Sequence, residues 1–212
     1  EKLLIDADIK GPGKAVGPYF DETPLKDSLG ATLQELQLDG DVNARLHLDI
    51  PLNGELVTAK GEVTLRNNSL FIKPLDSTLK NLSGKFSFIN GDLQSEPLTA
   101  SWFNQPLNVD FSTKEGAKAY QVAVNLNGNW QPAKTGVLPE AVNEALSGSV
   151  AWDGKVGIDL PYHAGATYNV ELNGDLKNVS SHLPSPLAKP AGEPLPVNVK
   201  VDGNLNSFEL TG

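Results

Sequence analysis

The stretch YQVAVNL at residues 120–126 places an apolar side chain at every second position, with a polar or small one between. Such alternation is typical of a β-strand with one buried face, because successive side chains of a strand point to opposite faces of its sheet. The same period recurs at residues 46–50, 107–111, 156–160, 168–172 and 197–201. The three-and-four spacing of an amphipathic helix is almost absent, so the sequence predicts an all-β protein.

Turn signals are as regular as the strands. An apolar residue is followed by Asn-Gly or Asp-Gly at seven places, which begin at Leu38, Leu52, Ile89, Leu126, Trp152, Leu172 and Val201. These dipeptides tolerate positive φ and favour the tight turns between antiparallel strands. We therefore expect most of the seven to be hairpin tips, and the rest to be bulges in long strands. Residues 36–50 fit either a hairpin at residues 39–40 or one bent strand.

Two short stretches, residues 23–29 and 139–146, interrupt the β pattern and are predicted as brief helices that open on a proline. After each comes an Asp-Gly pair and then a similar tetrapeptide, DIPL at residues 49–52 and DLPY at residues 159–162. The two copies lie roughly 110 residues apart, which predicts an internal repeat. The expected units are a leading strand and loop over residues 1–22, a first repeat unit over 23–137, and the front part of a second over 138–212.

The composition limits the possible functions. The 212 residues include 17 Lys and Arg against 26 Asp and Glu, and the net charge of −9 argues against binding nucleic acid or an anionic membrane through bulk charge. The absence of cysteine excludes disulfides, thiolate metal sites and cysteine nucleophiles. The chain begins at Glu1 and holds no methionine, so we expect a piece of a longer protein. Any membrane anchor would lie outside it, since no apolar run reaches about 18 residues.

No set of residues has the pattern of a catalytic or metal site. His47, His163 and His182 lack metal-ligand spacing, and we interpret them as surface residues. Asp49 and Asp159 hold equivalent repeat positions, so their carboxylates would stand a full repeat apart, too far to flank one glycosidic bond. Neither a Gly-x-Ser-x-Gly motif nor a phosphate-binding glycine loop is present. We expect no enzymatic activity, no metal and no cofactor.

Each of these many strands has one apolar face, and that face must be covered rather than left in water. A closed β-sandwich core is the common solution. The repeat instead favours a body that grows by stacking units and carries a continuous apolar surface. Aromatic residues are only 7% of the chain, and the apolar positions are mostly Val, Leu and Ile. A smooth aliphatic lining fits this composition at least as well as a tightly interlocked core.

The Asn/Asp-Gly strands and the Asp-Ile/Leu-Pro strand ends resemble the AsmA-like proteins of Gram-negative bacteria. Residues 91–103 and 138–161 are similar to one large member of that family. The resemblance implies a repeating β-groove, which is an elongated, twisted, U-shaped antiparallel sheet with an apolar inside, a polar outside and one or two short helices. It also implies a periplasmic segment of an inner-membrane-anchored protein that conducts phospholipid acyl chains between the inner and outer membranes and supports the permeability barrier.

On this interpretation, the apolar members of the alternating runs line the groove, although ordinary core packing is the alternative for each of them. The candidate lining residues are Leu46, Leu48, Ile50, Val63, Leu65, Phe86, Phe88, Val109, Phe111, Val122, Val124, Val156, Ile158, Leu160, Val170, Leu172, Val199 and Val201.

The three tryptophans, Trp102, Trp130 and Trp152, follow strand ends or turns and are either rim anchors or core plugs. They also support the main alternative function, a carbohydrate-binding or structural β-sandwich module of an envelope protein with the tryptophans as sugar platforms. A membrane-inserted barrel is a second alternative, and the missing aromatic girdles argue against it.

Overall fold

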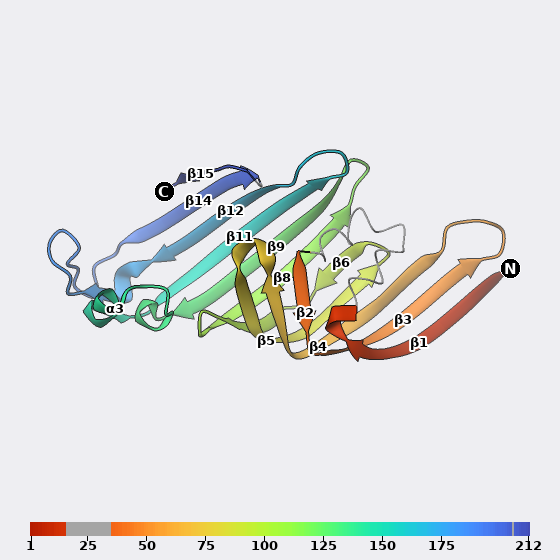
Figure 1. Cartoon of the computed structure of the whole chain (residues 1–212), viewed down its shortest axis with the longest axis horizontal. Coiled ribbons are helices and arrows are strands. Elements are labelled where there is room, and N and C mark those ends of the chain that lie inside the picture. The colour runs from red at the N-terminus through yellow and green to blue at the C-terminus, as the bar shows by residue number, and fades with distance from the viewer. Residues whose placement is uncertain (16–34, 205) are drawn as a thin grey trace.

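The computed structural model describes residues 1–15, 35–204 and 206–212 of the chain. One antiparallel sheet of 13 strands dominates this part, in the order β1-β3-β4-β5-β6-β8-β9-β11-β12-β14-β15, with β2 paired to β4, and β7 between β5 and β8. Figure 1 shows the sheet as a long twisted band with the first and last strands at opposite ends. The predicted all-β fold is confirmed.

The strands of the large sheet are β1 (Lys2–Pro12), β2 (Leu36–Asp39), β3 (Asp41–Pro51), β4 (Thr58–Ile72), β5 (Ser77–Ile89), β6 (Asp92–Ser95), β7 (Leu98–Trp102), β8 (Gln105–Glu115), β9 (Ala119–Trp130), β11 (Val150–Pro161), β12 (Thr167–Asp175), β14 (Pro196–Asn204) and β15 (Phe208–Thr211). A second sheet pairs β10 (Leu146–Gly148) with β13 (Val179–Ser181). The helical elements are η1 (Gly13–Ala15), η3 (Lys73–Leu75), η4 (Pro132–Lys134), α3 (Glu140–Ala145) and η5 (Leu176–Asn178).

The strand register turns the period-two sequence into one continuous apolar face. Val124 of β9 lies opposite Phe111 of β8 on one side and Val156 of β11 on the other. Val156 in turn lies opposite Val170 of β12, which lies opposite Val201 of β14. Because side chains alternate along every strand, a one-residue slip in any pair would turn this row to the other face.

The opposite face carries polar side chains in matching rows. Asn108 Nδ2 donates to Asn127 Oδ1 at 3.0 Å, and Asn173 Nδ2 donates to Asp153 Oδ2 at 3.2 Å. Asn198 Nδ2 donates to Asn173 Oδ1 at 2.6 Å. These short polar residues thus bridge neighbouring strands on the outer surface of the sheet.

The expectation that most Asn-Gly and Asp-Gly pairs form hairpin tips was wrong. Residues 53–54 and 90–91 lie in turns between strands, whereas four of the seven pairs lie inside β9, β11, β12 and β14. In these strands the glycine occupies the apolar face and leaves room for a large neighbour. Gly128 and Gly174, for example, lie directly opposite Trp152 from its two sides.

The remaining pair, at residues 39–40, is the bend that the second interpretation of residues 36–50 predicted. β2 and β3 both pair antiparallel with β4, so they are two halves of one strand broken at Gly40. Gly40 has φ +93°, a backbone conformation that other residues rarely adopt. Asn68 of β4 holds the break, since its Nδ2 donates to the carbonyls of Asp39 and Asp41 at 3.0 and 3.1 Å.

Beyond this bend, part of the sheet folds over its own apolar face. We call this part the flap; it consists of β2, residues 69–72 of β4, residues 77–83 of β5, and β7. Left-handed residues mark the fold line on β4 and β5, namely Asn67 and Asn81 at φ +54° and Gly84 at φ +136°. In Figure 1 the outer ends of β4 and β5 stand beside β2 in front of the main sheet. The buried core lies between the flap and the sheet and consists of Val42, Leu65, Leu79, Leu82, Leu98, Ala100, Leu107 and Val109.

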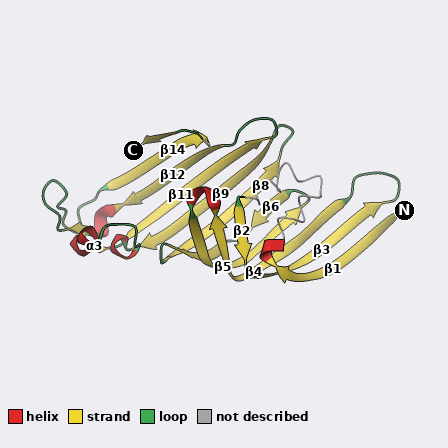
Figure 2. Cartoon of the chain, in the orientation of Figure 1, coloured by secondary structure: helices red, strands yellow, loops and turns green. Residues whose placement is uncertain are grey.

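Figure 2 shows that strands make up most of the described chain, with α3 near one end and further short helical turns in the middle. The helix predicted over residues 139–146 is present as α3, and the one predicted over residues 23–29 lies outside the described residues. The strands β1-β3-β4 and β9-β11-β12 pair in the same way, with Asp49 opposite Thr58 and Asp159 opposite Thr167. This agrees with the expected repeat, whose unit boundaries stay a prediction.

Candidate binding groove

All eighteen candidate lining residues lie on the same face of the large sheet, as the register of strands β3 to β14 shows. Two of them, Leu65 and Val109, belong to the buried core. Leu172 is 36% exposed, and the other fifteen are partly exposed. The structure therefore brings the candidates together on one surface, and their contact with a ligand stays a prediction.

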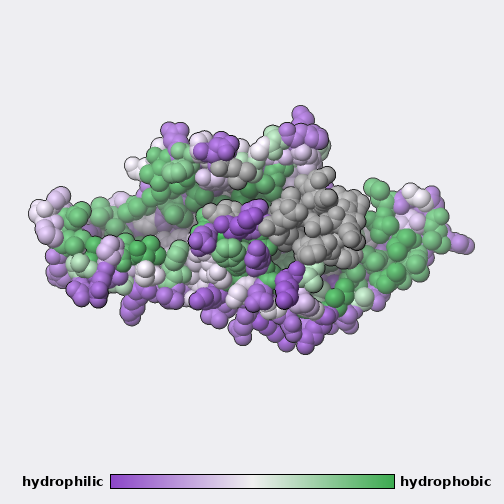
Figure 3. Space-filling model, in the orientation of Figure 1, coloured by the Kyte–Doolittle hydropathy of each residue, from purple (hydrophilic) through white to green (hydrophobic). Residues whose placement is uncertain are grey.

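The apolar face is open at both ends of the sheet. On β1, Leu3, Ile5 and Ile9 are between 37% and 49% exposed, and on β15 Phe208 and Leu210 are 70% and 63% exposed. Figure 3 shows apolar surface over β1 at one end of the molecule and over β12 and β14 towards the other. A single layer of sheet with one uncovered apolar side is a groove or a docking surface, because a folded monomer ordinarily covers such a face.

These five residues at the two ends were missed by the sequence analysis. The segment LLIDADI at residues 3–9 contains the alternation Leu3, Ile5, Ile9, but Leu4 is also apolar and obscures the period. Leu4 points to the other face and is 50% exposed. In the last strand, the alternating pair Phe208 and Leu210 is too short to be separated from chance by periodicity.

The tryptophans form one aromatic cluster together with Phe103. Trp102 stacks on Phe103 with ring centroids 4.7 Å apart, and Trp130 meets the edge of Trp152 at 4.8 Å. All three tryptophans pack against the buried core, which agrees with the core-plug interpretation. Trp102 Nε1 donates to Ser77 Oγ at 2.7 Å, and Trp130 Nε1 donates to the carbonyl of Pro106 at 2.6 Å. A row of exposed sugar platforms, as the carbohydrate-binding alternative requires, is not what these rings form.

One buried polar group lies where β6, β8 and β9 meet. Tyr120 is fully buried, and its Oη lies 2.8 Å from the carbonyl oxygen of Gly91 and 2.7 Å from Thr113 Oγ1. Burial raises the pKa of Tyr120 to about 12, and the negative charges of Asp92 and Glu115 act in the same direction. The phenol thus stays protonated and ties the turn between β5 and β6 to β9.

This pKa shift predicts a loss of stability at high pH. The unfolded phenol ionises near its ordinary pKa of 10, whereas the folded one keeps its proton until about pH 12. The free energy of unfolding therefore falls as the pH rises from about 10 to 12. We expect ultraviolet absorbance titration to show a tyrosine that ionises near pH 12, and Tyr120→Phe should remove this ionisation together with that part of the pH dependence. If the ionisation near pH 12 persists unchanged in Tyr120→Phe, the assignment to Tyr120 is contradicted.

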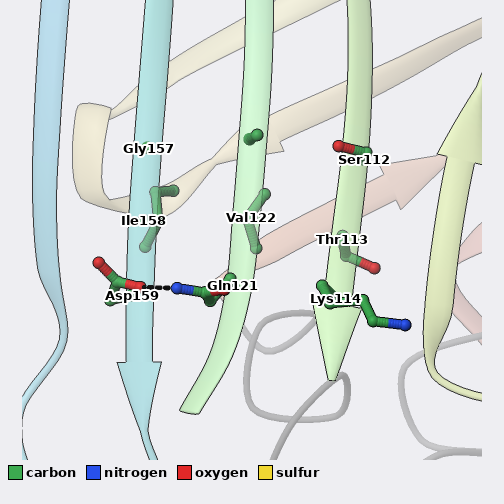
Figure 4. Close-up of a pocket in the computed structure, with 9 residues that line it drawn as sticks. Ser112, Thr113, Lys114, Gln121, Val122, Gly157, Ile158 and Asp159 are labelled. Carbon is green, nitrogen blue, oxygen red and sulfur yellow. Dashed lines mark hydrogen bonds between the residues drawn. The ribbon is translucent and has the colours of Figure 1, made fainter. Parts of the chain in front are cut away.

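A hollow of about 300 Å³ lies on the polar side of the sheet, where small residues of three neighbouring strands leave space. Ser112, Ala123 and Gly157 form its floor, and Gln121 Nε2 donates to Asp159 Oδ1 at 2.8 Å along its side (Figure 4). It faces away from the apolar surface and is not part of the groove.

The two aspartates at equivalent repeat positions lie far apart in the sheet. Asp49 and Asp159 lie on β3 and β11, six strands apart, which is about 29 Å at the usual spacing of roughly 4.8 Å between neighbours. Within the residues that the structure describes, no group of three His, Asp or Glu side chains is arranged to hold a metal ion. Nor does any helix in this part of the chain have the length and apolarity needed to cross a membrane.

Comparison with known proteins shows which proteins the chain is similar to. A model of the family described as YhdP protein matches residues 1–212. A protein of Escherichia coli (strain K12), the intermembrane phospholipid transporter YhdP, is 99% identical over 212 residues, which are 100% of this chain. The chain spans only 17% of the length of that relative. No solved structure matches the chain.

Proposed function

The chain belongs to the YhdP protein family, and on that premise we propose that it forms one stretch of a groove that shields phospholipid acyl chains between two membranes. The relative's printed function, intermembrane phospholipid transport, supports this proposal. The observation that carries it is the apolar face of the 13-stranded sheet, which continues from strand to strand and is open at both ends.

Physical chemistry explains why a lipid carrier needs such a surface. An acyl chain of roughly sixteen carbons costs about 12 kcal/mol to expose to water, at about 0.8 kcal/mol per methylene. Passage through an aqueous space therefore requires continuous apolar cover. The period-two strands supply an apolar side chain at every second residue, while the open side of the groove leaves the polar headgroup in water.

The same premise extends to the location and the wider role. We propose that the chain is a periplasmic part of a protein anchored in the inner membrane, that phospholipid passes along it towards the outer membrane, and that it supports the permeability barrier of that membrane. The protein then acts by shape and surface rather than by catalysis, in agreement with the wide separation of its candidate carboxylates.

Native mass spectrometry of the purified chain tests the proposal. We expect phospholipid to co-purify, and to rebind when the delipidated chain meets vesicles of phosphatidylethanolamine and phosphatidylglycerol. A chain that stays free of lipid in both experiments, yet binds soluble glycans, would contradict the groove and support a carbohydrate-binding module.

A further inference from the structure

The flap covers only part of the groove's width. On the strands that pass beneath it, the residues next to the fold line are buried, with Leu65 4%, Leu107 2% and Val109 8% exposed. Farther along the same strands, Val63 and Phe111 pack against the edge of this core and remain partly exposed. The middle of the groove therefore keeps a lane that the flap leaves open.

Phenylalanines line this lane. Phe86 of β5 and Phe111 of β8 lie on either side of Ser95 of β6, and their ring centroids are 5.6 Å apart at an interplanar angle of 55°. Ser95 is 7% exposed, and its Oγ accepts the backbone N–H of Phe111 at 2.8 Å. The small serine lets the two rings meet above β6. Phe88 lies two residues farther along β5, and its ring covers Gly61. A Cβ at position 61 would lie only 2.7 Å from the ring of Phe88.

The neighbours of these rings in the same row are all smaller. Continuing across the sheet from Phe86, the register gives Val63 and Ala44; from Phe111 it gives Val124 and Val156. Within this row, the two bulkiest side chains thus lie on strands that pass beneath the flap.

We propose that the rings of Phe86 and Phe111 form a constriction of the lipid path. They limit the amount of acyl chain that can pass the constriction at one time. This rests on the proposed function, since it names the residues of the same groove that limit passage. Lipid runs beside the flap, over the two rings, and not beneath it. The rings set the width because the buried core holds the flap in place.

Two positions of β9 on the same face test where lipid runs. Val122 lies in the open lane, and Leu126 packs against the core beneath the flap. In the full-length protein that carries this chain, we would replace each in turn with p-benzoylphenylalanine, irradiate cells and detect phospholipid adducts by mass spectrometry. We expect the yield at Val122 to exceed that at Leu126 by about fivefold, an energy difference of about 1 kcal/mol.

The outcomes separate the two proposals. Equal yields at Val122 and Leu126 would overturn the constriction. Ile158, outside the constriction, is replaced in the same way as a third position, and adducts at Ile158 with none at Val122 would also overturn it. Absence of adducts at all three positions would overturn the proposed function itself.

A matched pair of substitutions tests the role of the rings. Phe111→Trp narrows the lane, whereas Asn169→Trp adds the same ring on the outer face of β12, where Asn169 is exposed and points away from the groove. In cells that depend on this protein, we expect Phe111→Trp to slow the arrival of pulse-labelled phospholipid in the outer membrane by about fivefold, or about 1 kcal/mol in barrier. Asn169→Trp should leave the rate nearly unchanged.

Equal slowing by both tryptophans, or by neither, would overturn the assignment of Phe111. Circular dichroism of both variants checks the fold. Should Phe111→Trp fail to fold, Phe111→Leu replaces the ring with a smaller apolar side chain and should speed transfer. An unchanged rate in Phe111→Leu would then count against the constriction.

Discussion

Ile158→Asp is expected to reduce phospholipid binding by at least about tenfold, or about 1.4 kcal/mol, while the chain keeps its fold. Ile158 lies on the apolar face between Val122 of β9 and Tyr168 of β12. It is partly exposed, so a carboxylate there keeps its water as long as the groove is empty. An acyl chain that enters must displace this water and leave the charge without a partner, and the cost falls on binding rather than on folding.

The control for this variant lies on the same strand. Ala151→Asp introduces the same charge on the outer face of β11, where Ala151 is exposed and faces away from the groove. Native mass spectrometry should show normal phospholipid on Ala151→Asp and little on Ile158→Asp, with similar circular dichroism for both. If cells with Ile158→Asp keep a normal outer-membrane barrier in a background without redundant transporters, the groove is not the lipid path.

The sequence predicts the apolar face well because the alternation within each strand shows which side chains point to each face of the sheet. In β9 and β11 the alternation is long, with a glycine at one apolar position of each strand, and the register pairs apolar with apolar, for instance Val124 with Val156. A single layer of sheet adds no other constraint, so a local pattern is enough to place the lining residues on one surface.

The flap could not be predicted in this way. It depends on the left-handed backbone of Asn67 and Asn81, and on register shifts between β4 and β5 that leave almost no trace in the alternation. The Asn-Gly pairs misled the turn prediction for a related reason. A glycine that makes room for the ring of Trp152 has the same local sequence as one that permits a turn, and only the neighbouring strand distinguishes them.

Asn68→Ala is expected to destabilise the chain by about 3 kcal/mol, because the side chain joins three backbone groups at the fold line of the flap. Asn68 is fully buried, and its Oδ1 accepts the N–H of Arg66 at 2.8 Å. Its Nδ2 donates to the carbonyls of Asp39 and Asp41 on either side of the break in the strand. Alanine leaves all three groups without a partner, and urea unfolding should report the loss.

The effect should depend on donors at position 68 and not on its shape. Asn68→Asp keeps the shape but loses both donors, so we expect at least as large a loss. Asn127→Ala removes an exposed outer-face asparagine that accepts from Asn108, and should cost less than about 0.5 kcal/mol. Hydrogen exchange should localise the damage to residues 66–83, because the flap is held at this point. If Asn68→Ala unfolds at the same urea concentration as the unaltered chain, the flap is held by its apolar core alone.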